Sequence, residues 1–239
     1  LNQLNDAREL YKRGTENCHK CAPMWVHLSL LEERDGNMNK ARAVLEKGRS
    51  RMHGIDGEDM LWLFGTRLER RAGNEQAAVT LLAHGLQRLP NSGLLWSEDL
   101  LTCSKAAQKS KSIDALKRCE NNAQVVLAIG RLFIRDRKTE KARKWIERAA
   151  SLQPKLGDAW AHLYSFELQI HAQLFDRDVP KEELEQQQEV LNNIEKRCME
   201  AEPNRGELWN SIHKRTENRH KSPVAILKRC VAEITKNIL

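Results

Sequence analysis

One seven-residue pattern occurs three times in this 239-residue sequence, at residues 90–96, 154–160 and 203–209. Each copy begins with Pro, has Gly three residues later, and ends with Trp three residues after that. Because Pro cannot continue a helix, Gly permits a tight turn and Trp opens a new apolar run, the pattern predicts a joint between two helices. A joint that recurs along the chain predicts a repeat protein, in which each unit packs on its neighbours.

The Trp residues of these joints belong to a longer series with nearly regular spacing. Consecutive members are separated by 37, 34, 64 and 49 residues. The gap of 64 divides into 30 and 34 if Val126 occupies the position of a missing Trp, and the gap of 49 is 34 with an insertion of 15 residues. A period of about 34 residues is typical of a helix-pair repeat. The predicted structural positions of the repeats are Trp25, Trp62, Trp96, Trp160 and Trp209.

Two further spacings recur with the Trp series. A small residue comes sixteen residues after a Trp position and a second one seven residues later, as at Ala41 and Gly48. Small residues two turns apart on one helix face are expected to let the neighbouring helix approach closely. Three of the Trp positions are followed seven residues later by Glu, at Glu32, Glu69 and Glu167. We expect these side chains to accept hydrogen bonds from the adjacent unit.

Helical periodicity extends through most of the chain, and no apolar–polar alternation is long enough to predict a strand. The predicted fold class is therefore all-α, a right-handed α-solenoid of antiparallel helix pairs. It is expected to cover residues 1–239 as a single domain. The first predicted helix is the second helix of a pair, so the chain is expected to be a fragment of a longer array.

Three stretches depart from the regular pattern. Residues 103–111 are predicted to form a loop before a short helix at 112–120. The insertion, at about residues 173–188, is polar and contains Pro180, and it predicts either an extended helix or a flexible loop. The final helix pair is predicted at 206–219 and 223–238, with Ser222 as the N-cap.

The excess of positive charge lies in one part of the sequence. The whole chain has a formal net charge of +7, while residues 101–150 alone hold 13 basic and 5 acidic side chains. A localised basic block is typical of a surface for an acidic partner or a phosphate backbone, although solvated helix faces would have the same composition. The candidate partner-binding residues are Lys105, Lys109, Lys111, Lys117, Arg118, Arg131, Arg135, Arg137 and Lys138.

The sequence contains no residue pattern typical of an enzyme. It lacks a Gly-rich phosphate loop, a Gly-x-Ser-x-Gly motif and a His-Glu-x-x-His motif. Cys18 and Cys21 have the spacing of zinc ligands, but no second Cys or His pair follows at the separation that a zinc site needs. We therefore predict a protein without catalytic residues, metal, cofactor or small-molecule substrate. Cysteines in helical apolar patterns favour a reducing compartment, and no apolar run approaches the roughly 20 residues needed to span a membrane.

Several motifs narrow the type of repeat. Ala-Arg at 41–42 and 142–143, with Glu-Lys at 46–47 and Glu-Arg at 147–148, resembles the half-a-TPR (HAT) pattern, a close relative of the tetratricopeptide (TPR) repeat. Longer stretches are similar, in the same order, to the carboxy-terminal repeats of the pre-mRNA-processing factor six family. These stretches are residues 90–98, 111–120, 156–161, 166–169, 201–203 and 206–209.

The resemblance covers about residues 25–239 and implies a nuclear scaffold of the spliceosomal tri-snRNP that links component particles by protein contacts. The acidic insertion after His171 departs from the family pattern. The first function hypothesis is therefore a non-catalytic scaffold in pre-mRNA splicing, located in the nucleus, which bridges tri-snRNP proteins through the solenoid surface. The alternative is an RNA-contacting subunit that uses the basic 101–150 block. This block contains only two aromatic residues for base stacking, Phe133 and Trp145, and no RNA-recognition motif.

Overall fold

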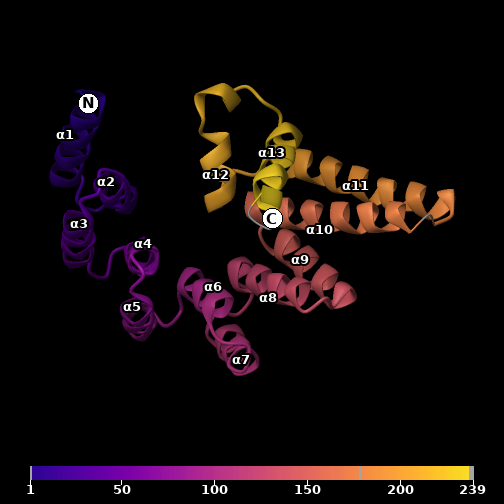
Figure 1. Ribbon diagram of the computed structural model, residues 1–239, viewed down its shortest axis with the longest axis horizontal. Coiled ribbons are helices and arrows are strands. Elements are labelled where there is room, and N and C mark those ends of the chain that lie inside the picture. The colour runs from indigo at the N-terminus through magenta and orange to yellow at the C-terminus, as the bar shows by residue number, and fades with distance from the viewer. Residues whose placement is uncertain (1, 178, 237–239) are drawn as a thin grey trace. The chain divides into compact units, whose positions relative to one another are not determined.

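The computed structural model describes residues 2–177 and 179–236. Over this part of the chain the regular structure is helical, with a single isolated bridge between Leu156 and Arg205 and no strand (Figure 1). The predicted all-α class is confirmed. The chain divides into two compact units, Leu1–Cys119 and Glu120–Leu239. The single array over residues 1–239 stays a prediction.

The first unit is a succession of helix pairs joined by short turns. Each helix packs on the next one along the chain, and α2, α4 and α6 also contact each other in turn, as expected for stacked pairs. The helices are α1 (Asn2–Asn17), α2 (Ala22–Arg34), α3 (Met38–Arg51), α4 (Glu58–Arg71), α5 (Glu75–Arg88), α6 (Gly93–Thr102) and α7 (Gln108–Arg118).

The small residues of the repeat allow close packing within the first unit. Ala41 is fully buried on α3, and a Cβ added at Gly48, two turns later, would lie 3.0 Å from Cγ of Trp25 on α2. The Trp25 side chain is itself buried, with 3% of its surface exposed. Because the indole rests directly on the α3 backbone, a larger residue at position 48 would push the two helices apart. The predicted role of the small residues is confirmed here.

The prediction for residues 103–120 was wrong about where the helix begins. The α7 helix starts at Gln108 rather than at 112, so the loop after α6 is short. Gln108 and Ala115 are both buried, and they lie seven residues apart on one face of α7. The many Lys and Ser residues suggested a loop, but they belong to an amphipathic helix, with Lys109 and Ser110 on its exposed face.

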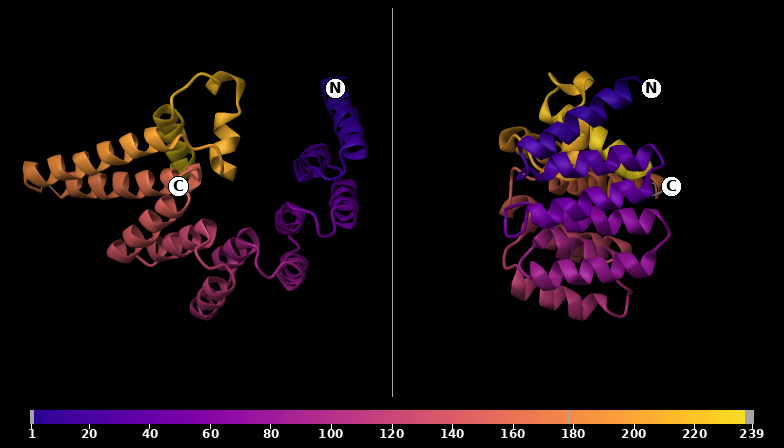
Figure 2. Two further views of the ribbon diagram at one scale, coloured as in Figure 1. Left: turned by 180° about the vertical axis from the view of Figure 1, so that it is seen from behind. Right: turned by 90° about the vertical axis from the view of Figure 1, so that its left-hand side faces the viewer.

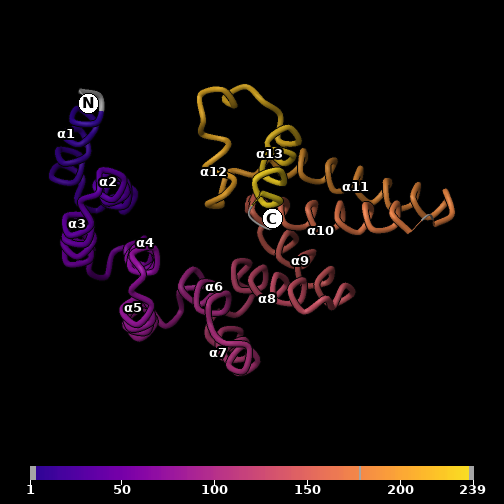
Figure 3. Tube along the Cα trace, viewed as in Figure 1, coloured from indigo at the N-terminus to yellow at the C-terminus, as the bar shows by residue number. Residues whose placement is uncertain are grey.

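The second unit follows the same plan, with two elements modified. The α8 helix packs on α9, α9 on α10 and α10 on α11, while α13 packs on α10, α11 and α12. The Cα trace in Figure 3 shows the longer connection between the last two α-helices. The elements are α8 (Ala123–Arg135), α9 (Thr139–Leu152), α10 (Gly157–Asp176), α11 (Lys181–Ala201), α12 (Glu207–His213), the 3-10 helix η1 (Thr216–Asn218) and α13 (Pro223–Lys236).

The insertion lengthens a helix pair. The α10 helix has 20 residues and α11 has 21, and they run side by side as a long hairpin (Figure 2). The insertion extends two helices rather than forming one extended helix or a flexible loop, since α10 ends at Asp176 and α11 begins at Lys181. Pro180 takes the N-cap position of α11, where its missing N–H and fixed φ are tolerated. Gln187 is buried between the two helices and donates to the Glu167 carboxylate over 2.8 Å.

The last pair differs from its prediction at its first helix. Instead of one helix over 206–219, α12 ends at His213 and a 3-10 turn follows at Thr216–Asn218. Asn218 is buried and donates its amide to the carbonyl oxygen of Ile212 over 2.8 Å, which ties this turn to the end of α12. The predicted N-cap of α13 is confirmed, because Ser222 accepts a hydrogen bond from the Ala225 N–H over 3.3 Å.

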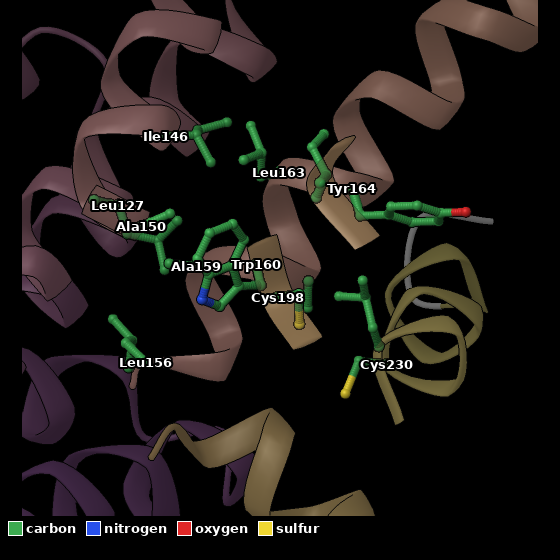
Figure 4. Packing of buried hydrophobic residues seen from close by; sticks show 14 of the residues in the cluster. Leu127, Ile146, Ala150, Leu156, Ala159, Trp160, Leu163, Tyr164, Cys198 and Cys230 are labelled. Atoms are coloured by element: carbon green, nitrogen blue, oxygen red, sulfur yellow. The ribbon is translucent and has the colours of Figure 1, made fainter. Parts of the chain in front are cut away.

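The core of the second unit is centred on Trp160. Figure 4 shows its indole between Ala150 of α9 and Cys198 of α11, with Cys230 of α13 beyond. Both thiols are fully buried, and burial raises the pKa of each to about 12. The thiols therefore stay protonated and pack as small apolar groups. Val126, the residue at the missing Trp position, is also fully buried.

Candidate functional site

The candidate basic residues divide between the two units. Five belong to the first unit, at and just before α7, and four belong to the second unit, on α8 and the turn that follows it. Each unit therefore presents a basic surface of its own. Their role in partner binding stays a prediction.

The α7 surface combines free and engaged basic groups. Lys109, Lys117 and Arg118 are exposed, and in the described part of the chain they form no ion pair. Lys111 is different, because its Nζ donates to Oδ1 of Asp99 on α6 over 2.6 Å. This contact holds α7 against α6, so Lys111 has a structural role that its place in the basic block did not indicate.

The basic residues of the second unit surround the turn between α8 and α9. Arg135, Arg137 and Lys138 are exposed, and Arg137 has a left-handed backbone with a φ of 57°. The Lys138 Nζ lies 3.6 Å from Oδ2 of Asp136 and 5.8 Å from the Phe133 ring centre. The second aromatic residue of the block, Trp145, is half-buried and lies beneath the Arg148 guanidinium at 5.6 Å. Each ring thus already has a cation over it, where a stacked base would have to compete.

The joint Trp residues share a hydrogen bond that the spacing alone did not reveal. In three of them the indole Nε1 donates to the backbone carbonyl six residues earlier. The pairs are Trp25 with His19 at 2.9 Å, Trp96 with Pro90 at 2.8 Å, and Trp160 with Pro154 at 2.8 Å. The indole therefore closes the turn between two helices as well as filling the space beside it. A donor with an apolar body suits these three positions. Trp62 donates instead to the Glu58 carboxylate over 3.1 Å, and the buried Nε1 of Trp209 has no hydrogen-bond partner among the described residues.

A second recurring contact joins neighbouring helix pairs. An Arg on the second helix of one pair donates to the Glu that follows the Trp of the next pair by seven residues. The Nε–Oε1 contacts are Arg8 with Glu32 at 2.8 Å, Arg42 with Glu69 at 2.7 Å, and Arg143 with Glu167 at 2.7 Å. The expected hydrogen bond to each Glu is confirmed. We call these contacts the Arg–Glu pairs.

The protonation of the Arg–Glu pairs follows from their geometry. The hydrogen bond with Glu167 raises the pKa of Arg143, and the hydrogen bond from Arg42 lowers the pKa of Glu69. Arg143 and Glu69 therefore stay charged at neutral pH, and each Arg–Glu pair acts as a fixed clamp between helices. This arrangement stabilises the repeats and provides no proton donor or acceptor for catalysis.

Two helices carry an apolar residue in place of the Arg. Val79 on α5 follows Ala78 as Arg42 follows Ala41, and its surface is 51% exposed. Ile113 occupies the same position on α7 and is 46% exposed. The contacts between neighbouring helix pairs therefore differ. Some contain an Arg–Glu pair, and others have an exposed aliphatic side chain at the same position.

Several joint residues are held in place by contacts between distant parts of the sequence. The N–H of Gly157 donates to the carbonyl of Arg205 over 2.8 Å, which brings the joints at 154–160 and 203–209 together. Asp158 then accepts the N–H groups of Glu207 and Trp209, each over 2.8 Å. Burial raises the pKa of Asp158, and these backbone donors oppose that shift. The Asp at 158 therefore caps a helix that starts 49 residues later.

The remaining titratable groups do not form a reactive cluster. Burial lowers the pKa of His162 to about 3, with a smaller contribution from the charge of Arg131. Within the described residues, no group of three or more His, Cys, Asp and Glu side chains could hold a metal ion. Cys18 is exposed and Cys21 partly so. None of the helices described here is long and apolar enough to cross a bilayer.

Comparison with known proteins places these repeats in a wider group. A family model described as the tetratricopeptide repeat matches residues 123–156, which span α8, α9 and the turn between them. The pre-mRNA-splicing factor prp1 of Schizosaccharomyces pombe is 33% identical over 225 residues, which is 94% of this chain. Human pre-mRNA-processing factor 6 is 43% identical over 134 residues, or 56% of this chain.

The chain is a TPR-like repeat protein that resembles pre-mRNA-processing factor 6. It spans 23% of the length of the fission yeast protein and 12% of the human one. Among solved structures, BtubC (BKLC) from P. vanneervenii matches with a TM-score of 0.51 at 13% identity, over 86% of this chain and 92% of that one. At that identity the match shows the fold alone.

Proposed function

We propose that this chain is a non-catalytic scaffold segment of a pre-mRNA splicing complex, and that it acts in the nucleus. In this role it binds other proteins of the tri-snRNP through the surfaces of its helix pairs. The observation that carries the proposal is the 33% identity to a pre-mRNA-splicing factor over 94% of the chain, together with the TPR-like repeats. Stacked helix pairs present extended surfaces, which suit the binding of protein segments.

The chemistry of the described residues supports a role without catalysis. The most strongly shifted titratable groups are His162, Tyr164, Cys198 and Cys230, and burial is the main cause of each shift. Burial holds the His neutral and keeps the phenol and both thiols protonated. The recurring charged residues are engaged in the Arg–Glu pairs between helices. An active site would need groups of these types. In this chain the shifted groups are buried in the core, and the recurring charged residues hold helices together.

The test is a pull-down from nuclear extract with the purified chain, performed with and without ribonuclease. If the chain is a protein scaffold, tri-snRNP proteins should remain bound after the RNA is digested. Release of all splicing proteins by ribonuclease would refute the proposal. A matched chain with Trp160→Ala and Trp209→Ala, in which loss of two buried indoles should unfold the second unit, controls for non-specific capture.

A second candidate function is direct contact with RNA through the α7 surface. It is favoured by Lys109, Lys117 and Arg118, which are exposed and form no ion pair within the described residues. Three phosphate contacts predict that log affinity for single-stranded RNA falls with log salt at a slope of about −2. Fluorescence anisotropy with a labelled oligouridine between 50 and 300 mM salt measures this slope. A dissociation constant in the millimolar range that does not change with salt would exclude the contact.

A further inference from the structure

Three helices of the second unit line a pocket that is open to solvent and has a volume of about 370 Å³. Leu163 and Glu167 of α10 form its floor, while α9 and α11 provide the two sides. The α10 helix packs on both α9 and α11. The pocket lies along the part of the long hairpin that faces α9. Its volume is at the lower end of the range for pockets that hold a small ligand or a short stretch of chain. We call it the α9–α11 pocket.

Both arginines of the α9–α11 pocket are already paired with acidic residues. Arg143 of α9 donates to Glu167 over 2.7 Å, and Arg197 of α11 lies 2.5 Å from Oε1 of Glu147. Glu189 of α11 is exposed and makes no ion pair with any described residue. The pocket thus carries one uncompensated negative charge. An occupant that supplies a positive charge is favoured, and an acidic occupant is disfavoured.

The same side of α11 presents amides and an aliphatic surface. Gln186 and Asn193 line the pocket, are exposed, and form no side-chain hydrogen bond with the described residues. Val190 lies between them and is 40% exposed. Two other amides of the same helix donate within the chain: Gln188 donates to Asn192 over 3.0 Å and Gln187 to Glu167 over 2.8 Å. Gln186 and Asn193 are thus available to an occupant of the pocket.

The spacing of these groups suits an extended chain. Gln186 and Asn193 are seven residues apart on one helix face, which separates them by about 10 Å along the helix axis. An extended peptide covers that distance in about three residues. Each amide carries both a donor and an acceptor, so the pair can bond the main chain of such a peptide at two points. Between them, Val190 and Glu189 are placed to contact its side chains.

We propose that the α9–α11 pocket binds an extended segment of a protein partner in which a Lys or Arg lies next to an aliphatic residue. The basic side chain pairs with Glu189, the aliphatic side chain packs on Val190, and the main chain bonds Gln186 and Asn193. This inference rests on the proposed scaffold function and names one docking site within it. An acidic segment or a nucleic acid backbone would meet Glu189 as a like charge.

The test uses a display library of random nonapeptides as the probe, selected on the whole chain. The pocket variant carries Glu189→Lys and Val190→Ser. Its matched control carries Glu185→Lys and Met199→Ser, which make the same kinds of change at exposed positions of α11 that do not line the pocket. All four side chains are exposed, so both variants should retain the circular dichroism spectrum and melting temperature of the wild type.

We expect the selected peptides to be enriched in a basic residue beside an aliphatic one. In fluorescence anisotropy, a selected peptide should bind the pocket variant at least tenfold more weakly than the wild type and bind the control normally. Enrichment of acidic or purely apolar peptides, absence of enrichment, or equal binding to all three proteins would overturn the proposal. Sedimentation velocity tests the other occupant: a wild-type dimer that the pocket variant abolishes would show that a second copy fills the pocket, which also overturns it.

The outcome can be separated from that of the scaffold function. If the pocket variant and the wild type retain the same tri-snRNP proteins from nuclear extract, and no basic peptide is selected, the pocket proposal fails while the scaffold function stands. If basic peptides bind Glu189 and Val190 but no splicing protein is retained by the wild type, the scaffold function fails while the pocket remains a peptide site.

Discussion

Replacing the indole at the centre of the second unit should destabilise that unit strongly. Trp160 is 3% exposed and donates through Nε1 to the Pro154 carbonyl over 2.8 Å. Burial of its roughly 200 Å² of apolar surface contributes up to about 5 kcal/mol, and the hydrogen bond adds about 1 kcal/mol. An Ala retains a small part of that burial. We therefore expect Trp160→Ala to lower the free energy of unfolding by about 4 kcal/mol, within the usual range for Trp→Ala in a core.

A second substitution at the same position separates packing from hydrogen bonding. Trp160→Phe keeps most of the ring burial but removes the donor to Pro154, so we expect a loss of about 1–2 kcal/mol. Trp145→Ala is the matched control, because this Trp is half-buried and lies outside the joint series. Its loss should also be about 1–2 kcal/mol, mainly from the contact with Phe133 at a ring-centre separation of 6.4 Å.

The assay is urea unfolding of the whole chain, followed by far-UV circular dichroism. Amide hydrogen exchange in α10 identifies the transition of the second unit. With a denaturant slope near 2 kcal/mol per molar, a loss of about 4 kcal/mol lowers the midpoint by about 2 M. A change below about 1 kcal/mol for Trp160→Ala would show that the indole is not packed in the joint.

Three further perturbations test separate parts of the structure. Glu167→Gln leaves Arg143 without its buried charged partner and should cost about 1–3 kcal/mol in urea titration, whereas Glu140→Gln, at the exposed partner of the same Arg, should cost less than about 0.5 kcal/mol. Gly157→Ala places a Cβ inside the Trp209 indole and should cost about 1–3 kcal/mol by thermal unfolding; no recovery on adding Trp209→Phe would show that the overlap is not the cause. His162 has a pKa of about 3 in the fold against about 6.5 when unfolded, so its neutral form stabilises the fold above pH 6.5 and this contribution is lost as pH falls toward 3, at up to about 1.4 kcal/mol per pH unit. Equal slopes of stability against pH for the wild type and His162→Gln would contradict that assignment.

The repeat architecture was predictable because it depends on the spacing of residues that are close together in the sequence. The position of a Pro, a Gly and a Trp determines where one helix ends and the next begins, and each unit repeats the same short-range contacts. The same spacing located Val126 at a missing Trp position, and that residue is fully buried. The Glu residues that follow the Trp by seven were expected to bond an adjacent unit, and they do so through the Arg–Glu pairs.

Contacts between distant residues were not predictable from these patterns. Nothing in the spacing indicates that Asp158 caps a helix 49 residues later, because that contact depends on how the insertion folds back. The sequence left the insertion open between a helix and a loop, and only the packed hairpin distinguishes the two. In the sequence, the basic block is one continuous stretch. In the structure, Lys111 contacts Asp99, and the other basic residues are divided between the two compact units.

The α9–α11 pocket was outside the reach of the sequence for the same reason. Its lining comes from three helices, and the residues that matter most, Glu189 and Val190, lie in or near an insertion with no repeat partner for comparison. The sequence did indicate where to look, because the regular repeat spacing is interrupted by the acidic stretch after His171. In a repeat protein, insertions commonly map to loops on one face, often the binding face.

Cross-linking of this chain within an intact tri-snRNP particle, with the linked lysines mapped by mass spectrometry, tests the proposed scaffold role. A protein scaffold predicts links from lysines of both units to at least two other proteins of the particle, and these links should persist after ribonuclease treatment. Absence of protein links, or links that disappear when RNA is digested, would contradict the claim.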